Sequence, residues 1–466
     1  MLALLGALAL IAVACGDDSG EDDGGSTGVG QQAEEVDSEA DEEPTDGESA
    51  GDEPDPEPAE EDPVENFDSA TGVTADTIRV GITVPDFEAL QAAGLPNYQG
   101  DAETAFQPFI DRINADGGIA GRMIEPVYVD FNFLDPETQD RACAELTEDH
   151  EVFIVLYGLL SSSNLCLTSL HETMVMTGVY QTEADRDASG DTVWLQLEAT
   201  DEARAEILAG VVAGAGLLEG KTIAAVASGE IGGEQTGNRL KETLNELGYD
   251  VTLHVTQGDG TDPTQRDANY ALLAQRMSAD GVDFLFNLIG GGTSTEDFAA
   301  AGFRPERTAY TVFNIDTEAS SDKTLLEGGI TVGDRNDAAV WDDPEFRANC
   351  IDPILEDFPE LTDEFSYLPD SDQQAAGEPL WITPARTACN HTRLLKLIGE
   401  IVGPDLNNET FRLALDELGA VELYGYGDAT FSSDGKWDGL DEFYLQEYDL
   451  ETDSLVIVGD PIVVDR

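Results

Sequence analysis

The chain alternates short apolar stretches with amphipathic ones, and this alternation constrains its fold more than any other feature. Runs of β-branched and apolar residues occupy 78–84, 124–129, 152–157 and 174–180. The segments between these runs carry apolar residues at helical spacing. Strands that alternate with helices form parallel sheets, because each parallel connection must cross back over the sheet. We therefore expect an α/β fold.

A second series of the same kind begins near residue 201. Its expected strands lie at 222–227, 249–255, 283–287, 309–313 and 330–332, with helices at 203–214, 234–247, 264–278 and 295–301. Two series in tandem predict two doubly wound lobes. Residues 425–464 differ, since they are rich in strand-forming and aromatic residues, and we expect an antiparallel extension there.

The N-terminus has the pattern of a bacterial lipoprotein signal. Residues 1–14 form an apolar run that ends in small residues, and Cys15 and acidic residues follow. The run is shorter than the roughly 20 apolar residues that span a bilayer. We expect a signal peptide over 1–14 and lipid attachment at Cys15, which would anchor the protein to a membrane. An ordinary cleaved signal or a buried N-terminal helix is the alternative.

The segment behind Cys15 has the composition of a spacer. Gly, Ser, Pro, Asp and Glu dominate it, and Arg79 is the first basic residue of the chain. Such a segment buries too little apolar surface to offset the entropy of ordering, and its like charges repel. We expect residues 15–75 to form a disordered acidic tether.

The formal charge of −75 restricts the partners of this chain. Nucleic acids and anionic lipid head groups bind basic surfaces, so neither is expected as a partner. A surface so acidic suits a saline environment, in which salt screens the repulsion between its charges.

Four cysteines remain beyond Cys15, and an exported chain is expected to join them in two disulfides. Three pairings are open. We favour Cys143–Cys166 and Cys350–Cys389, which are the pairs closest in sequence. Zinc is the rival, but the chain has no Cys-x-x-Cys spacing and its histidines are scattered. No metal or cofactor is therefore expected.

Three stretches resemble the leucine/isoleucine/valine-binding type of the periplasmic binding protein family. They are IRVGITVPDF at 78–87, FIDRINADGGIAGRMIEPVYVD at 109–130 and DPETQDRACAEL at 135–146. The family's middle stretch ends in an Asn-x-x-Gly-Gly-Ile-x-Gly-Arg motif. The matching residues here are Asn114, Gly117, Gly118, Ile119, Gly121 and Arg122. Weaker similarity continues to the C-terminus.

The resemblance implies two α/β lobes joined by three crossings. The first lobe would comprise 76–198 and 332–427, and the second would comprise 199–331 and 428–466. It also implies an extracytoplasmic substrate-binding protein of an ABC importer, which captures a small solute and delivers it to membrane permease and ATPase subunits. Branched-chain amino acids, amides and short carboxylic acids are the solutes to consider.

Ligands of open α/β sheets bind at the carboxyl ends of the strands. In the family a serine after the third strand holds the ligand carboxylate. Ser161 matches that position, and Ser162 lies one residue beyond. Thr182 follows the next strand, where the family places a Thr or Ser, and Tyr98 falls where the family often has an aromatic. Simple N-capping by residues 163–164 is the alternative for the serine-rich loop.

The second lobe departs from the family pattern. The aromatic residues that the family places near 230–233 and 288–294 are missing. Asp316 is the nearest candidate to pair a ligand ammonium, and an exposed loop acid is its alternative role. The missing aromatics leave a branched-chain amino acid no better supported than an amide, a short peptide or a small acid.

Two other functions remain. A ligand-sensing receptor subunit would use the same two-lobed domain. An exported enzyme is the less supported alternative, because the chain has neither the Gly-Lys-Ser/Thr end of a P-loop nor a Gly-x-Ser-x-Gly elbow.

Overall fold

The computed structural model describes most of the chain beyond its N-terminal part. The described residues are 65–92, 99–178, 182–229, 232–256, 263–289, 294–311, 321–333, 340–365 and 379–464. Cys15, the expected signal peptide, the tether up to residue 64, Tyr98 and Asp316 lie outside them. Among the helices of the described residues, none is both long and apolar enough to cross a lipid bilayer.

The first sheet has five parallel strands in the order β2-β1-β3-β4-β5. The strands are β1 (Thr77–Pro85), β2 (Met123–Phe131), β3 (Ile154–Leu156), β4 (Met174–Thr177) and β5 (Trp194–Gln196). Helices and helical turns connect them: α1 (Phe87–Ala92), α2 (Ala102–Ala115), α3 (Pro136–Ala144), η1 (Glu145–Asp149), η2 (Ser161–Ser163), η3 (Cys166–Leu170) and α4 (Glu183–Ser189). β3, β4 and β5 are buried at every position, as strands covered on both faces are.

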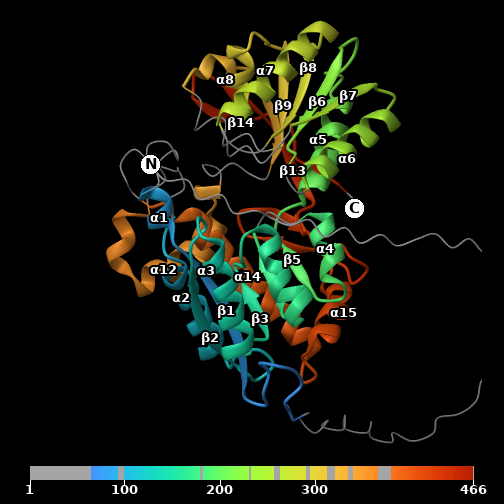
Figure 1. The fold of residues 1–466 in the computed structure, drawn as a ribbon. Coiled ribbons are helices and arrows are strands. Elements are labelled where there is room, and N and C mark those ends of the chain that lie inside the picture. Colours follow the sequence, from blue (N-terminus) through green and yellow to red (C-terminus); the bar gives the residue numbers. More distant parts are fainter. Residues whose placement is uncertain are drawn as a thin grey trace, which may run out of the picture. The chain divides into compact units, whose positions relative to one another are not determined.

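The second sheet has eight strands and mixed polarity. Its parallel part is ordered β10-β9-β8-β6-β7, and β13, β14 and β15 extend it in antiparallel fashion (Figure 1). The strands are β6 (Ile223–Ala227), β7 (Val251–Val255), β8 (Phe284–Leu288), β9 (Arg307–Tyr310), β10 (Ile330–Gly333), β13 (Glu442–Asp449), β14 (Ser454–Ile457) and β15 (Ile462–Val463). The helices are α5 (Asp201–Gly214), α6 (Gly233–Glu246), α7 (Pro263–Asp280), α8 (Ser294–Ala300) and the 3-10 turn η4 (Lys323–Leu325).

The chain passes between the two sheets three times: after β5, after β10 and before β13. The first and third crossings are hydrogen-bonded to each other. Gln196 N–H donates to Trp437 O at 2.8 Å, and Leu440 N–H donates to Leu197 O at 3.1 Å. The fold class expected from the sequence, α/β with two doubly wound lobes, is confirmed. The residue boundaries of the lobes stay a prediction.

A helical segment after β10 covers the first sheet. It comprises α11 (Pro344–Phe346), η5 (Arg347–Ile351), α12 (Asp352–Asp357), η6 (Pro359–Asp363), α14 (Ile382–Val402) and α15 (Asn408–Leu418), followed by the β11 (Val421–Leu423) and β12 (Gly427–Ala429) ribbon. α14 packs against α2, which itself packs on β1 and β2 (Figure 1).

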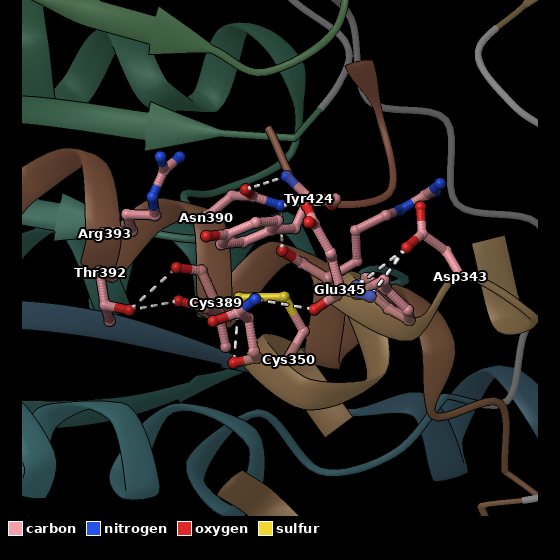
Figure 2. Close-up of a disulfide and its surroundings, with 12 residues drawn as sticks. Asp343, Glu345, Cys350, Cys389, Asn390, Thr392, Arg393 and Tyr424 are labelled. Atoms are coloured by element: carbon pink, nitrogen blue, oxygen red, sulfur yellow. Dashed lines mark hydrogen bonds between the residues drawn. A yellow bond between two sulfur atoms is a disulfide. The ribbon is translucent and has the colours of Figure 1, made fainter. Parts of the chain in front are cut away.

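Two disulfides fasten helices of the first lobe. Cys143 on α3 is joined to Cys166 on η3, and Cys350 on η5 is joined to Cys389 on α14. Figure 2 shows the second disulfide beside Asn390, whose side chain pairs with both the N–H and the C=O of Tyr424 at 2.8 and 2.9 Å. The disulfide and the amide therefore hold α14 from two neighbouring segments.

The last residues of the expected tether belong to the folded domain. Val73 is 2% exposed, and Ser69 Oγ donates to Leu406 O at 2.6 Å. Arg122, fully buried, donates to the backbone carbonyls of Phe67 and Thr74 at 3.0 and 2.7 Å. Residues 65–75 are thus ordered by packing and hydrogen bonds, and a tether can extend only to about residue 64, not to 75.

Candidate functional site at the carboxyl edge of the first sheet

The strand order of the first sheet locates a candidate site. In the order β2-β1-β3-β4-β5 the winding reverses between β1 and β3. A crevice forms at such a reversal, outside the carboxyl ends of the two strands, and open α/β sheets bind their ligands there. Thr83 on β1 links the two strands at this end, since its buried Oγ1 donates to Gly158 O at 2.5 Å. The residues that follow β3 therefore form the candidate site.

Two residues directly after β3 adopt left-handed backbone conformations. Tyr157 has φ +75° and Gly158 has φ +72°. Tyr157 is strained, because a side chain with a Cβ disfavours this region by about 1–3 kcal/mol. At Gly158 the space itself requires glycine, since an added Cβ would lie 2.5 Å from Thr177 Cγ2. Strain of this kind is typical of binding and catalytic sites, which supports the assignment.

Tyr157 is held by three side chains. Its hydroxyl donates to Gln99 Oε1 at 3.1 Å, and its ring meets that of Phe106 edge-on, with centroids 6.2 Å apart. Its backbone N–H points to Nδ1 of His391, 3.4 Å away. The strained residue is therefore fixed by groups from the segment before α2, from α2 and from α14.

His391 is a neutral group beneath this site. It is 0% exposed, and desolvation by burial lowers the pKa of its imidazole to about 3. Nδ1 accepts from Tyr157, so Nε2 carries the proton. A hydrogen bond with the backbone of Thr177 favours the protonated ring, but desolvation by burial outweighs it. The floor of the site thus carries no positive charge from histidine at physiological pH.

The loop after Gly158 is closed by one amide side chain. Asn164, 1% exposed, accepts from Leu159 N–H at 2.7 Å and donates to Leu159 O at 2.6 Å. Ser162 is exposed within the 3-10 turn η2, and only the backbone of Ser161 is described. The expected hydroxyl site therefore lies on a fixed loop, and the role of its serines stays a prediction.

Thr182 has a structural role of its own. It is the N-cap of α4, where its hydroxyl accepts from Asp185 N–H at 3.1 Å and the Asp185 carboxylate accepts from the backbone and hydroxyl of Thr182. Thr182 also packs closely against Gly232, just before α6. A Cβ added at Gly232 would lie 2.8 Å from Thr182 Cγ2. A ligand contact by Thr182 stays a prediction.

Charged side chains surround the start of α4. Nη2 of Arg239 on α6 donates to both carboxylate oxygens of Glu183, at 2.7 and 2.9 Å. Its backbone N–H donates to Glu202 Oε2 at 3.3 Å. Burial raises the pKa of Glu202 to about 7, and its Oε1 has no partner among the described residues. Glu202 is thus a carboxyl group that titrates near neutral pH.

The second sheet reverses its winding between β6 and β8. At the end of β8, Asn287 donates from Nδ2 to Ser294 Oγ at 2.8 Å, and both side chains are buried. The loops that would carry a second-lobe contact, including Asp316, are outside the described residues.

The motif behind the family resemblance is structural. Asn114 pairs with both backbone groups of Ile124 at 2.7 and 2.9 Å, and an added Cβ at Gly118 would lie 1.9 Å from Arg122 O. Arg122 also donates to the carbonyls of Gly403 and Pro404 at 3.2 and 2.7 Å. The motif therefore fixes the turn before β2 and binds three chain segments together, away from the candidate site.

A metal site is not supported by the described residues. The group whose donor atoms come together consists of Cys143, Cys166 and His171. The two sulfurs are bonded to each other, and a disulfide offers no thiolate ligand.

Sequence reasoning missed Tyr157, Gln99 and His391. Gly158 directly after a strand was the available signal, because glycine at such a position often marks close backbone approach.

Comparison with known proteins gives one family and many similar structures. A family model described as periplasmic binding protein matches residues 77–336. No curated protein sequence matches the chain at a significant level. The solved structures described next share a low sequence identity with this chain, so each similarity shows a shared fold alone.

The first is the solute-binding protein of an ABC transporter from Rhodopseudomonas palustris BisB5 in complex with 3,4-dihydroxybenzoic acid, with TM-score 0.56, 15% identity and coverage of 84% of this chain and 98% of that one. An ABC transporter substrate-binding protein from Desulfitobacterium hafniense, in complex with Leu, has TM-score 0.53 and 15% identity. The match covers 82% of this chain and 100% of that one. A fatty acid ABC transporter substrate-binding protein from Thermomonospora curvata has TM-score 0.55, 14% identity and coverage of 86% and 95%.

Proposed function

Because the chain belongs to the periplasmic binding protein family, we propose that it is the substrate-binding component of an ABC importer and acts outside the cytoplasm. The observation that carries the proposal is the strained Tyr157–Gly158 pair at the point where the first sheet reverses its winding. A site fixed at that point suits reversible capture of a solute.

The solute we propose is a small molecule with a carboxylate group. The structures that resemble this chain are named for a dihydroxybenzoic acid, for leucine and for fatty acid transport, and a carboxylate is common to these three ligand types. His391 is neutral, so the site would hold the carboxylate with hydroxyls and backbone N–H groups. The turn η2, which begins at Ser161, offers both kinds of donor.

We propose that Ser161 and Ser162 donate to the carboxylate and that Thr182 lies beside it. We propose that the aromatic rings of Tyr157 and Tyr98 contact the apolar part of the solute. A hydrogen bond to a charged group contributes roughly 1.5–3 kcal/mol. The second lobe would close over the other end of the solute, with Asp316 pairing an ammonium group when the solute carries one.

We further propose that Cys15 carries a lipid that anchors the protein to the cell membrane, near the permease and ATPase subunits. The acidic segment up to residue 64 would then act as the spacer between the anchor and the folded domain. Cys15→Ser should release the protein from the membrane fraction or leave it unprocessed, and unchanged retention would contradict the anchor.

A thermal-shift screen with matched solutes tests the ligand class. Each carboxylate is paired with its amide, as in 4-hydroxybenzoate and 4-hydroxybenzamide, or leucine and leucinamide. A ligand that binds only the folded protein raises the melting temperature. We expect one or more carboxylates to raise it and the matched amides to have little effect. An equal response to both members of every pair would contradict a carboxylate site.

A further inference from the structure

A surface pocket of about 530 Å³ lies apart from the candidate site. It is formed by the end of α4, by α15 and by the turn at 433–437. Its volume falls in the range of pockets that hold small molecules. None of the residues to which we assign solute binding lines it.

Two arginines bring positive charge to this pocket. Arg186 Nη1 donates to Gly435 O at 3.1 Å, and Arg412 Nη1 donates to Ser433 O at 3.0 Å, so both guanidinium groups reach the same turn. A guanidinium has five N–H donors, and each of these bonds uses one. The chain has 22 basic residues against 97 acidic ones, so two arginines on one short turn are a local exception.

The groups that line the pocket differ in exposure. Trp437, 4% exposed, is one of them, and its buried Nε1–H has no acceptor among the described residues. The side chain of Arg186 is 28% exposed and that of Asp187 is 77% exposed. Asp191 and Asp434 also line the pocket and are exposed. Arg186 Nη2 also lies 3.6 Å from Asp187 Oδ1. The donors of the pocket are therefore its less exposed groups, and the carboxylates are its more exposed ones.

We propose that this pocket is a second binding site, for a small zwitterion such as an amino acid or a betaine. The carboxylate of the ligand would lie against Arg186 and Arg412, and its cationic end would lie among Asp187, Asp191 and Asp434. A simple anion is disfavoured by the exposed aspartates and by the charge of the whole protein, and a simple cation is disfavoured by the two guanidinium groups. A molecule that carries both charges satisfies both sets of groups.

Indole NMR signals provide a local test. The chain has four tryptophans, so ¹⁵N-tryptophan labelling gives four indole N–H signals. The signal that Trp437→Phe removes is that of Trp437. The probes are glycine betaine, acetate as the anion alone and tetramethylammonium as the cation alone. We expect betaine to shift the Trp437 signal saturably, with an affinity at least tenfold above that for either half. Absence of a saturable shift with betaine would overturn the proposal.

Variants separate binding from folding of the turn. Arg412→Gln should weaken betaine binding at least tenfold, and Arg276→Gln, an exposed arginine on α7, is the matched control. Asp434→Asn leaves the turn intact, because Asp416 holds Ser433 through its N–H and hydroxyl. Asp434→Asn should weaken betaine binding and strengthen acetate binding. Equal betaine affinity in the wild type, Arg412→Gln and Asp434→Asn would overturn the proposal. A failure of the thermal-shift screen to find a carboxylate ligand for the first site would leave this proposal unaffected.

Discussion

The backbone N–H of Tyr157 points to Nδ1 of His391, 3.4 Å away, so a buried imidazole supports the strained residue at the end of β3. Acceptance of this hydrogen bond requires a neutral ring. Burial lowers the pKa of His391 to about 3, which keeps the ring neutral in the folded protein.

This shift makes stability depend on pH. An unfolded histidine takes up a proton below a pKa of about 6.5, and His391 in the folded protein does so only near pH 3. The folded state therefore loses stability as the pH falls through this window, by about 1.4 kcal/mol per pH unit. We expect His391→Gln to remove that dependence. Urea unfolding at pH 7, 6 and 5 measures the free energy of unfolding, with His150→Gln, at an exposed histidine, as control. If the free energies of wild type and His391→Gln change in parallel with pH, His391 is not the source of the dependence.

Glu202 should act in the opposite direction. Burial raises its pKa to about 7 from an ordinary value of 4.5, so its charged form is disfavoured in the folded protein. The cost is absent below pH 4.5 and grows as the pH rises to 7. Glu202→Gln should therefore stabilise the protein at pH 8 by up to roughly 2–3 kcal/mol and have little effect at pH 4. Melting temperatures at both pH values test this, with the exposed Glu246→Gln as control. If Glu202→Gln raises the melting temperature equally at pH 4 and pH 8, the raised pKa of Glu202 is not the cause of the gain.

The fold was predictable because its signal is periodic. Most strands and helices of 77–333 follow an apolar pattern with breaks at Gly and Asp, and such patterns indicate parallel α/β structure. α1, α4 and β5 were not expected from the sequence. α14 (Ile382–Val402) was not assigned from the sequence. It is buried on most sides and includes Pro384, Arg386, Asn390 and His391 among its buried residues, so it shows no polar face and no simple stripe. Asn390 donates to Arg386 O within the helix and to Tyr424 O, a partner distant in sequence.

The site was only partly predictable. Most expected strands end within two residues of the observed positions, since a strand end depends on the local sequence. β4 ends at Thr177 and β9 at Tyr310, three residues before their expected ends. The left-handed conformation of Tyr157 is supported by His391 and Gln99, and that of Gly158 is required by the approach of Thr177; the fold brings these residues from other elements. The boundary of the tether was also missed, because residues 65–75 are held to the domain by contacts with Arg122 and Leu406, which are distant in sequence.

These contacts predict where the chain can be shortened. A protein that begins at Pro63 should have the melting temperature and solute affinity of the full mature chain. Removal up to Ala75 deletes the buried Val73 and leaves two donors of Arg122 without acceptors, which should cost several kcal/mol. Thermal unfolding of the two truncated proteins measures the difference. Equal stability would show that residues 65–75 do not hold the domain together.

Two substitutions of Thr182 distinguish its role as the N-cap of α4 from a contact with the solute. Thr182→Ala removes the N-cap of α4 and should cost about 0.5–2 kcal/mol of stability, whereas Thr182→Ser keeps the hydroxyl and should cost little. If Thr182 also contacts the solute, the alanine variant should lose affinity beyond its loss of stability, and the serine variant should keep most of it. Unfolding and titration of the two variants measure both effects.

The most direct test of a carboxylate-binding solute receptor is calorimetric titration of the carboxylate that gives the largest shift in the thermal screen. The titration compares the domain that begins at Pro63 with its Ser161→Ala variant and with Ser278→Ala, an exposed serine on α7 outside both proposed sites. The account predicts saturable binding to the wild type and to Ser278→Ala. Binding to Ser161→Ala should be weaker by about tenfold or more, because one hydrogen bond to a charged group is lost. An affinity that is the same for all three proteins would contradict it.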